Sequence, residues 1–438
     1  MGYAKVKTTI PGPKTKELLK QWHENEADKL GYQAQVAIDH GRGAMLYDVD
    51  DNVFIDWSSG VLVTNVGHCH PKLVEAVQEA SEHVLNVYEW CTPYRANAAR
   101  DLVNAAPSHL DKCFFMSSGS EVTDCSARIM KRYTHNYEII SFYGGFHGRT
   151  LSTASLGGLS KSKYGMGPML PGSIRVPYPY CYRCPFKSNP EKCGLLCLDF
   201  MNDIIRANST GSLAGLIIEP YQGSAGFIFP PEGFLPAVES WCREKNIPFT
   251  LDEVQSSYGR TGKMWALEHE ALTPDIVTVG KGIGSGVTVA ALLMRDEMIK
   301  DSMHKGDMGS TYGGNPISCA AVSAVLKIMK DEKLPERAAR LGKIISSRLS
   351  KIQEKCKYIG DVRGRGMVWG VELVEDRETK EPAPEKVNKL IDLAAEKGLL
   401  IGSVGMFGNV VRVAPPLVIT EEQLDESLEI FEQCTKQL

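Results

Sequence analysis

Hydrophobic and polar positions alternate regularly between about residues 70 and 330 of the 438-residue chain. Short apolar runs, typical of buried strands, are each followed by a polar loop and often by a stretch with the spacing of an amphipathic helix. The runs stand in KCFFMSSGS, YEIISFYGG, AGLIIEP, IPFTLDEVQ and DIVTVGKG. Strands that alternate with helices form a mostly parallel sheet with helices on both faces. The pattern therefore predicts an α/β domain.

The pattern differs on either side of this region. Residues 44–57 (AMLYDVDDNVFIDW) predict a hairpin whose two strands flank an Asp-Asp-Asn turn. After about residue 325, long helical stretches precede short strands and a closing helix that begins after Thr420, a good N-cap. We therefore predict a large domain over residues 66–325 and a small α+β domain built from residues 1–65 and 326–438.

Polar residues follow the predicted strands. Ser118, His147, Glu219, Asp252 and Lys281 each lie at or just after the end of an apolar run. In an open parallel sheet, ligands bind beyond the carboxyl ends of the strands, where the loops converge. We therefore expect these residues to meet in one crevice.

Lys281 follows the run DIVTV and has glycine at positions 280, 282, 284 and 286. Glycine lets a ligand approach the backbone closely, and a lysine amine whose pKa is lowered there can attack an aldehyde carbon. Asp252, at another strand end, would favour the protonated form of a pyridine nitrogen by charge pairing. Taken singly, Lys281 is equally well interpreted as a solvated loop lysine, and Asp252 is better interpreted as an N-cap or turn residue.

Ser118, Gly119 and Ser120 lie between a strand and a helix. Backbone N–H groups, hydroxyls and the helix dipole converge at such a point, which predicts a phosphate site; a simple serine N-cap is the alternative. The segment has neither G-x-G-x-x-G nor a P-loop lysine, which disfavours a dinucleotide or a nucleoside triphosphate.

Together, these motifs resemble those of the class III pyridoxal-phosphate aminotransferases of fold type I, the group of ω-amino-acid, ornithine and 4-aminobutyrate enzymes. The resemblance spans about residues 35–425 and rests on the order and spacing of SGSE (118–121), FHGRT (146–150), IIEP (217–220), LDEVQ (251–255), GKG (280–282), GSTYGGNP (309–316) and VRVAPPL (411–417). It implies that the large domain binds pyridoxal 5′-phosphate (PLP). It also implies a transaminase that moves an amino group from an ω-amino acid or primary amine to a 2-oxo acid, pyruvate or 2-oxoglutarate.

The resemblance implies roles for single residues. Lys281 would form a Schiff base with the cofactor and then transfer a proton as general base and acid. Asp252 would pair with the ring nitrogen, Gln255 would bind the ring hydroxyl, and Phe146 would stack on the ring. These four residues would thus hold the reacting part of the cofactor.

The same resemblance implies that Gly119 and Ser120 bind the cofactor phosphate together with Thr311 of a second subunit, and hence that the enzyme is a homodimer. The complete predicted cofactor site is Ser118, Gly119, Ser120, Phe146, His147, Glu219, Asp252, Gln255, Lys281 and Thr311. No metal is assigned to it.

Two arginines are predicted to bind substrate. Arg412, in VRVAPPL, resembles the arginine that holds the substrate carboxylate by a bidentate fork, and Arg149 resembles the second arginine of the 4-aminobutyrate enzymes. In the 4-aminobutyrate and ornithine enzymes, a glutamate five residues after the Glu of IIEP pairs with the carboxylate arginine. Here Ser224 stands at that position. Arg412 therefore lacks this partner, which favours constant readiness for an α-carboxylate and argues against strict specificity for 4-aminobutyrate or ornithine.

Composition narrows the partners and the compartment. The net charge is -4 and acidic and basic residues are interspersed, so the sequence has no concentration of basic residues that would predict binding to nucleic acid or to an anionic membrane. The sequence has no apolar run of membrane-spanning length, and its start lacks a signal peptide's apolar core. Most of the twelve cysteines are scattered singly, which suits a reducing compartment. These features predict a cytoplasmic protein with small-molecule partners.

Four cysteines form a cluster in the sequence. Cys181, Cys184, Cys193 and Cys197 have the spacing C-x2-C-x8-C-x3-C, with which four thiolates can bind zinc. The alternative, a loop with packing cysteines, is favoured because the middle spacing is shorter than that of common zinc modules.

Two other functions compete with transamination. Some members of the same family are amino-acid racemases or 2-epimerases, which return the proton to the opposite face of the substrate carbon. A PLP-binding regulator without turnover is the third alternative. It is disfavoured because such regulators append a DNA-binding domain and only about 35 residues precede the predicted fold.

Overall fold

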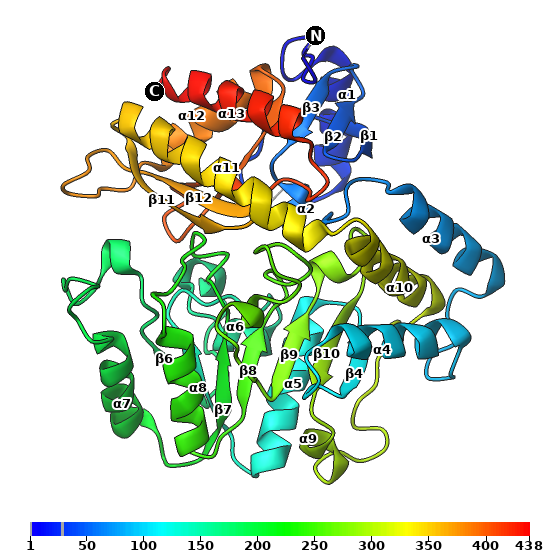
Figure 1. Cartoon of the computed structure of the whole chain (residues 1–438), viewed down its shortest axis with the longest axis vertical. Helices are drawn as coiled ribbons and strands as arrows, with labels where there is room; N and C mark the ends of the chain where they lie inside the picture. The colour runs from blue at the N-terminus through cyan, green and yellow to red at the C-terminus, as the bar shows by residue number, and fades with distance from the viewer. Residues whose placement is uncertain (1, 28–29) are drawn as a thin grey trace. The chain divides into compact units, whose positions relative to one another are not determined.

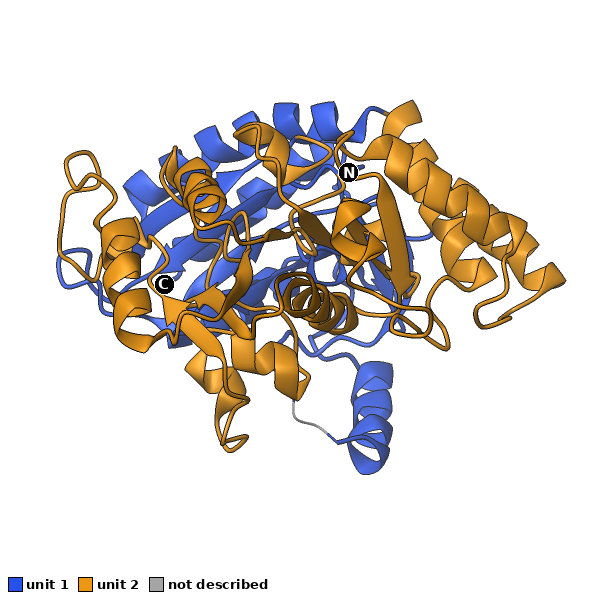
Figure 2. Ribbon diagram, turned by 90° about the horizontal axis from the view of Figure 1, so that it is seen from below, with its two compact units in different colours: residues 1–71, 259–262, 333–438 blue, residues 72–258, 263–332 orange. Residues whose placement is uncertain are grey.

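The computed structural model describes residues 2–27 and 30–438 and divides the chain into two compact units (Figure 2). Unit 1 consists of Met1–Pro71, Gly259–Gly262 and Lys333–Leu438. Unit 2 consists of Lys72–Tyr258 and Lys263–Glu332. Both ends of the chain therefore belong to the same unit.

The central element of unit 2 is a sheet (Figure 1) whose order, in the described part of the chain, is β4-β10-β9-β8-β7-β5-β6. Its strands are β4 (Lys112–Met116), β5 (Glu138–Phe142), β6 (Ser173–Val176), β7 (Leu213–Ile218), β8 (Phe249–Asp252), β9 (Ile276–Val279) and β10 (Ala290–Met294). Pairings from β6 through β9 are parallel, and β10 is antiparallel to both of its neighbours. This confirms the predicted α/β architecture with a mostly parallel sheet.

Helix α5 (Gly119–Thr134) shows how the sequence forms the helical layer. Ser118 and Glu121 form a capping box that satisfies N–H groups at its N-terminus. Its apolar face, which includes Val122, Ile129 and Met130, is buried in the core beside β7, β9 and β10. The other helices of this region are α3 (Pro71–His83), α4 (Pro93–Ala105), α6 (Leu151–Leu156), α7 (Leu196–Asn208), α8 (Phe234–Glu244), α9 (Glu297–Lys300) and α10 (Pro316–Asp331).

The described residues of unit 1 form two smaller sheets, of order β1-β2-β3-β13 and β11-β12-β15-β14. The strands are β1 (Ile38–Arg42), β2 (Met45–Asp48), β3 (Val53–Asp56), β11 (Ile359–Arg365), β12 (Val368–Leu373), β13 (Leu399–Leu400), β14 (Gly402–Val404) and β15 (Val410–Val413). The helices are α1 (Pro13–Asn25), α2 (Ser59–Leu62), α11 (Leu334–Lys355), α12 (Pro384–Glu396) and α13 (Glu421–Thr435). Strands β2 and β3 form the predicted hairpin, and Thr420 caps α13 as predicted.

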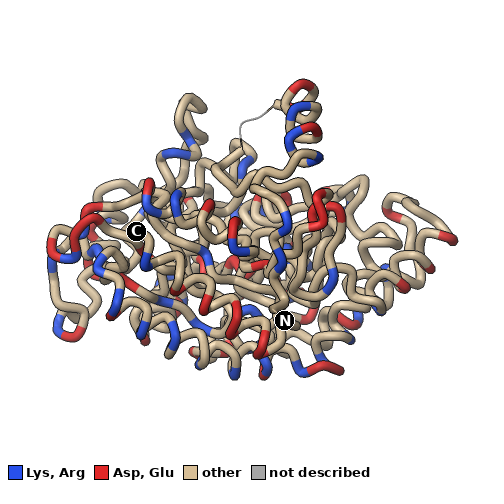
Figure 3. The backbone as a smooth tube through the Cα atoms, turned by 90° about the horizontal axis from the view of Figure 1, so that it is seen from above, with Lys and Arg blue, Asp and Glu red and all other residues tan. Residues whose placement is uncertain are grey.

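Acidic and basic residues are interspersed along the backbone of the described chain (Figure 3). No helix within residues 2–27 and 30–438 is both long and apolar enough to span a membrane.

Candidate active site

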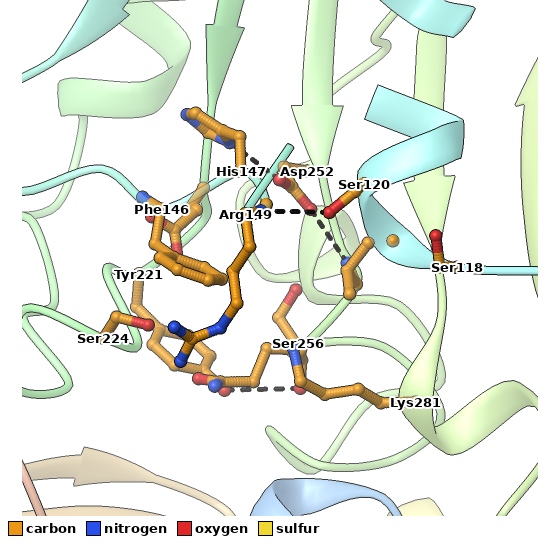
Figure 4. A pocket seen from close by; sticks show the side chains of 15 residues that line it. Ser118, Ser120, Phe146, His147, Arg149, Tyr221, Ser224, Asp252, Ser256 and Lys281 are labelled. Atoms are coloured by element: carbon orange, nitrogen blue, oxygen red, sulfur yellow. Dashed lines mark hydrogen bonds and ion pairs between the residues drawn. The ribbon is translucent and has the colours of Figure 1, made fainter. Parts of the chain in front are cut away.

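A cavity of about 270 Å³ lies at the carboxyl ends of the strands of unit 2 (Figure 4). Its lining consists of Ser118, Gly119, Ser120, Phe146, His147, Gly148, Arg149, Glu219, Tyr221, Ser224, Asp252, Val254, Gln255, Ser256 and Lys281. Ten of these residues belong to the predicted site. Strands β5, β7, β8 and β9 are parallel neighbours. Strand β4 runs in the same direction on the other side of the antiparallel β10, so the carboxyl ends of all five strands lie at one edge of the sheet.

Lys281 begins the short helix η4 (Lys281–Ile283), directly after Gly280 and strand β9. Its φ of 48° lies in the left-handed region, where a residue other than glycine is strained, and such strain is typical of functional sites. Burial lowers the pKa of the amine, and the charges of Asp252 and Glu219 act in the opposite direction. A larger neutral fraction makes this amine a better nucleophile.

Asp252, the last residue of β8, is held on both carboxylate oxygens. Oδ1 accepts hydrogen bonds from Val254 N and Thr278 Oγ1, both at 3.1 Å. Oδ2 lies 2.7 Å from Nδ1 of His147, and both side chains are buried. Burial alone would lower the pKa of His147, but the hydrogen bond to Asp252 and the charges of Asp252 and Glu219 raise it. These contacts therefore fix the position of the Asp252 carboxylate at the pocket.

Glu219 follows β7 and ties two loops together. Its Oε1 accepts from Phe146 N at 2.9 Å, and its Oε2 accepts from Gly223 N at 3.1 Å. Burial raises its pKa to about 7, a rise that the His147 charge opposes and the Asp252 charge increases. Glu219 thereby fixes the backbone that carries the Phe146 ring, which the sequence motif alone did not indicate.

Arg149 lies on the Phe146 side of the pocket, with its Cζ 5.8 Å from the centre of the Phe146 ring. Tyr221, which the sequence analysis did not predict, lies on the same side, and its hydroxyl is 3.4 Å from the carbonyl oxygen of Gln255. Its only signal in the sequence is its position two residues after Glu219. This wall combines aromatic faces with one permanent positive charge.

The N-terminus of α5 supplies the polar end of the pocket. The hydroxyl of Ser118 accepts from Glu121 N at 3.3 Å, and the Glu121 carboxylate accepts from Ser118 N at 2.8 Å. Ser118 is therefore a helix cap, the alternative considered from the sequence, as well as a lining residue. Ser120 Oγ accepts from Arg149 N at 3.0 Å. The N–H groups of the first turn and the helix dipole provide an anion site at this end.

Two predicted residues are not among those that line this cavity. Thr311 is exposed in unit 2, and its carbonyl oxygen accepts from Asn86 Nδ2 at 3.0 Å. Arg412 lies on β15 of unit 1 and is 9% exposed.

The four clustered cysteines line a second, small cavity of about 20 Å³, together with aromatic and proline side chains. All twelve cysteines are free thiols. Among the described residues, no group of three or more His, Cys, Asp or Glu side chains is arranged to hold a metal ion.

Comparison with known proteins identifies the family. The model of the class-III aminotransferases matches residues 28–435. The chain belongs to the class-III aminotransferases. A probable 4-aminobutyrate aminotransferase of Bacillus subtilis (strain 168) is 37% identical over 399 residues, which are 90% of this chain and 91% of that protein. An alanine/serine racemase of Pyrococcus horikoshii is 35% identical over 446 residues, which are 100% of this chain and 93% of that protein.

The solved structures agree with this family. The crystal structure of an amine transaminase from an uncultivated Pseudomonas species, in its PLP-bound form, has a TM-score of 0.89 and 25% identity to this chain. The match covers 94% of this chain and 98% of that one. The resemblance and the fold predicted from the motifs are confirmed.

This class-III aminotransferase uses PLP as its cofactor and is a transaminase with an amino donor and a 2-oxo acid as substrates. Its pocket fits the cofactor. Within the described residues, the buried Gln255 Oε1 has no hydrogen-bond partner, the first turn of α5 offers N–H groups to a phosphate, and Phe146 supplies an aromatic wall. An amine and an anchored carboxylate complete the set of groups that PLP requires.

Replacing Gly223 by alanine tests the importance of the Gln255 position. A Cβ at residue 223 would lie 1.9 Å from Gln255 Oε1, so the Gln255 side chain must leave its place in the pocket. We expect the Kd for PLP to rise about tenfold, the effect of losing one hydrogen bond in a buried polar site, as measured by titrating the apoenzyme and following cofactor absorbance. Gly31→Ala is the control, because a Cβ there meets nothing within 4 Å. Equal Kd values for both variants would contradict the prediction.

Proposed function

We propose that this aminotransferase moves an amino group from an ω-amino acid or a primary amine to pyruvate or 2-oxoglutarate. The observation that carries this proposal is the pocket in unit 2, where Lys281 and Asp252 lie with Arg149 and Ser224. Arg149 offers a fixed positive charge to a distal carboxylate. Ser224 is small and neutral, so the pocket also admits donors without such a group.

The residues of the pocket divide the work. PLP, when bound, withdraws electrons from the substrate carbon. Asp252, held by His147, would keep a proton on the ring nitrogen, and Gln255 would bind the ring hydroxyl. The N–H groups of Gly119 and Ser120 would hold the phosphate. The Lys281 amine, with its lowered pKa, would remove a proton from the substrate carbon as a general base and would then donate it as a general acid.

A donor screen tests the proposal. The holoenzyme is mixed with ω-amino acids, taurine, diamines, aminosugars or α-amino acids, with pyruvate or 2-oxoglutarate as acceptor, and the cofactor absorbance is followed. The expected result is loss of the absorbance with an ω-amino acid or primary amine and its recovery with the acceptor. Absence of any change with every donor would refute the proposal.

The second candidate is an amino-acid racemase or 2-epimerase. It is favoured by the 35% identity to the alanine/serine racemase over 100% of this chain. Incubation with one L-amino acid and no 2-oxo acid separates the two functions. Formation of the D-isomer supports the racemase. A reaction that stops after one molecule of amino acid has reacted per bound cofactor supports the transaminase.

We further propose a homodimer in which Thr311 contacts the cofactor of the partner. Three large aromatic side chains near Thr311 are exposed. Tyr312 follows Thr311 in the sequence and is 65% exposed. Tyr88 (53%) and Trp90 (80%) lie shortly after Asn86, which donates a hydrogen bond to the Thr311 carbonyl oxygen. Exposed aromatic residues of this size are typical of protein interfaces. We also propose a cytoplasmic location, which twelve free thiols support.

The Thr311→Ala variant tests this assembly. It is expected to remain dimeric by light scattering and to bind PLP about tenfold more weakly, because one hydrogen bond to an anion is lost. Ser310→Ala is the neighbouring control. A monomeric wild-type enzyme, or an unchanged PLP affinity in Thr311→Ala, would contradict the proposal.

A further inference from the structure

Arg412 has an incomplete set of hydrogen-bond partners within unit 1. Its Nη2 donates to Ser58 Oγ at 2.9 Å. Its buried Nε has no hydrogen-bond partner among the described residues. Since Nη2 carries two hydrogens and Ser58 accepts one of them, the guanidinium keeps further N–H groups without a hydrogen-bond partner among the described residues. Arginine N–H groups of this kind bind carboxylates.

The backbone around Arg412 makes room for this guanidinium. Strand β15 pairs with β14, and Gly402 stands opposite Arg412 in that pairing. A Cβ at residue 402 would lie 2.5 Å from Arg412 Nη2 and 3.5 Å from Ser58 Oγ. Glycine at 402 therefore allows the contact between Arg412 and Ser58.

Ser58 itself precedes an unusual turn. Ser59, Gly60, Val61 and Leu62 have φ values of 49°, 57°, 68° and 61°, so the segment forms a left-handed turn. Such a turn is unfavourable for residues other than glycine and persists only when the surroundings hold it. Ser59 Oγ donates to the carbonyl oxygen of Ala414 at 2.6 Å, which ties the turn to the end of β15.

Asp56 supports the same turn with both carboxylate oxygens. Oδ1 accepts from Ser58 N at 2.6 Å and from Ser59 N at 3.1 Å, and Oδ2 accepts from Ser59 N at 3.0 Å. His68 Nε2 lies 2.8 Å from Oδ2 and fixes the carboxylate. Burial lowers the pKa of Arg412, and the charge of Asp56 opposes that effect. Asp56 thus partly offsets the positive charge of Arg412 while its carboxylate is held by Ser58, Ser59 and His68.

We propose that Ser58, held by Asp56 just before the left-handed turn, is a positioning residue that aims Arg412 at the carboxylate of the substrate. This rests on the proposed role of Arg412 as the carboxylate-binding arginine. A neutral hydroxyl accepts from one side of the guanidinium, and no acidic side chain has to leave before a carboxylate binds. The arrangement favours substrates that bring a carboxylate to this guanidinium, namely the 2-oxo acid acceptor and carboxylate-bearing donors, whereas a primary amine binds without this contact.

Ser58→Ala tests the inference in the holoenzyme. Two quantities are measured: the Kd of butanoate, a carboxylate that cannot react, by calorimetry, and the single-turnover reaction with alanine or with 1-phenylethylamine, which has no carboxylate. We expect the butanoate Kd and the alanine half-saturation to rise about tenfold, since a hydrogen bond to a charged group is lost. The limiting rate with alanine and the half-saturation with 1-phenylethylamine are expected to stay unchanged.

Three further variants distinguish a specific effect of the Ser58 hydroxyl on Arg412 from a general effect on unit 1. Ser58→Thr retains a hydroxyl and is expected to restore the butanoate affinity. Gly402→Ala leaves Ser58 intact but displaces the guanidinium, so it should weaken butanoate binding in the same way. Ser427→Ala, which removes the acceptor of Trp57 Nε1 in the same unit, is the matched control.

The outcomes distinguish this inference from the proposed function. Unchanged butanoate affinity in both Ser58→Ala and Gly402→Ala, with weakened affinity in Arg412→Ala, would overturn the role of Ser58 alone. Unchanged affinity in Arg412→Ala as well would overturn the proposed role of Arg412. An equal loss of affinity in Ser427→Ala would show a general effect on the unit and would also overturn the inference.

Discussion

Replacement of Lys281 by alanine is expected to reduce transamination about 10³-fold, within the range that loss of a positioned acid-base group produces. The other basic side chains that line the pocket cannot substitute for it. A guanidinium such as that of Arg149 does not release its proton, and His147 is engaged with Asp252. The measurement is kcat after reconstitution with saturating PLP. In addition, mass spectrometry after borohydride treatment should show the cofactor covalently bound to the wild-type chain but not to the variant.

Lys163→Ala is the matched control for this experiment. Burial also lowers the pKa of Lys163, and its Nζ donates to Gly157 O at 2.8 Å, but it does not line the pocket. We expect this variant to keep its kcat and its covalent cofactor. If Lys281→Ala retained more than about a tenth of the wild-type kcat, the acid-base role of Lys281 would be refuted.

Asp252→Asn is the second change with a large expected effect, a fall in kcat of about 10²-fold. An amide cannot hold the ring nitrogen in its protonated form by charge pairing. The measurement is kcat at saturating PLP, with Asp275→Asn as control. Asp275 is also a buried carboxylate of unit 2, but it binds Arg243 and does not line the pocket. Equal kcat losses in the two variants would indicate general destabilisation and contradict the assignment.

The same variant should change the pH dependence of stability. The pKa of His147 in the folded protein is raised above 6.5, so its contribution to stability is fully present below about 6.5 and is lost as pH rises through the raised pKa. Loss of the Asp252 charge leaves burial to dominate, and the histidine pKa falls. The measurement is the thermal unfolding temperature of the apoenzymes between pH 6 and 9, which is roughly the titration range of a histidine with a raised pKa. We expect the unfolding temperature of Asp252→Asn to depend less on pH than that of the wild type. Parallel profiles would exclude the coupling.

Most of the pocket was predictable because of where its residues stand in the sequence. Ser118, Glu219, Asp252 and Lys281 each follow an apolar run, and parallel strands bring such ends to one edge. The cofactor chemistry was predictable only from the resemblance of the combined motifs, because Lys281 alone is equally well interpreted as a loop lysine.

The features that sequence could not provide depend on side-chain geometry. The contact between His147 and Asp252 requires two rotamers that no spacing encodes, and Tyr221 has no motif of its own. In the left-handed turn, only Gly60 is of a residue type that favours positive φ, so the turn is specified by Asp56 and its hydrogen bonds. Contacts within the chain explain these features, whereas the role that we propose for Thr311 would require a partner subunit.

The Glu219 carboxylate has a consequence for anyone who wishes to alter the donor range by directed evolution. It joins the backbone at Phe146 to that at Gly223, and these loops bear Arg149 and Ser224 respectively. Substitutions whose neighbourhoods share one rigid tie are generally not additive. Libraries that randomise positions 149 and 224 together should therefore reach activities that stepwise libraries, selecting one site at a time, would discard at the first round.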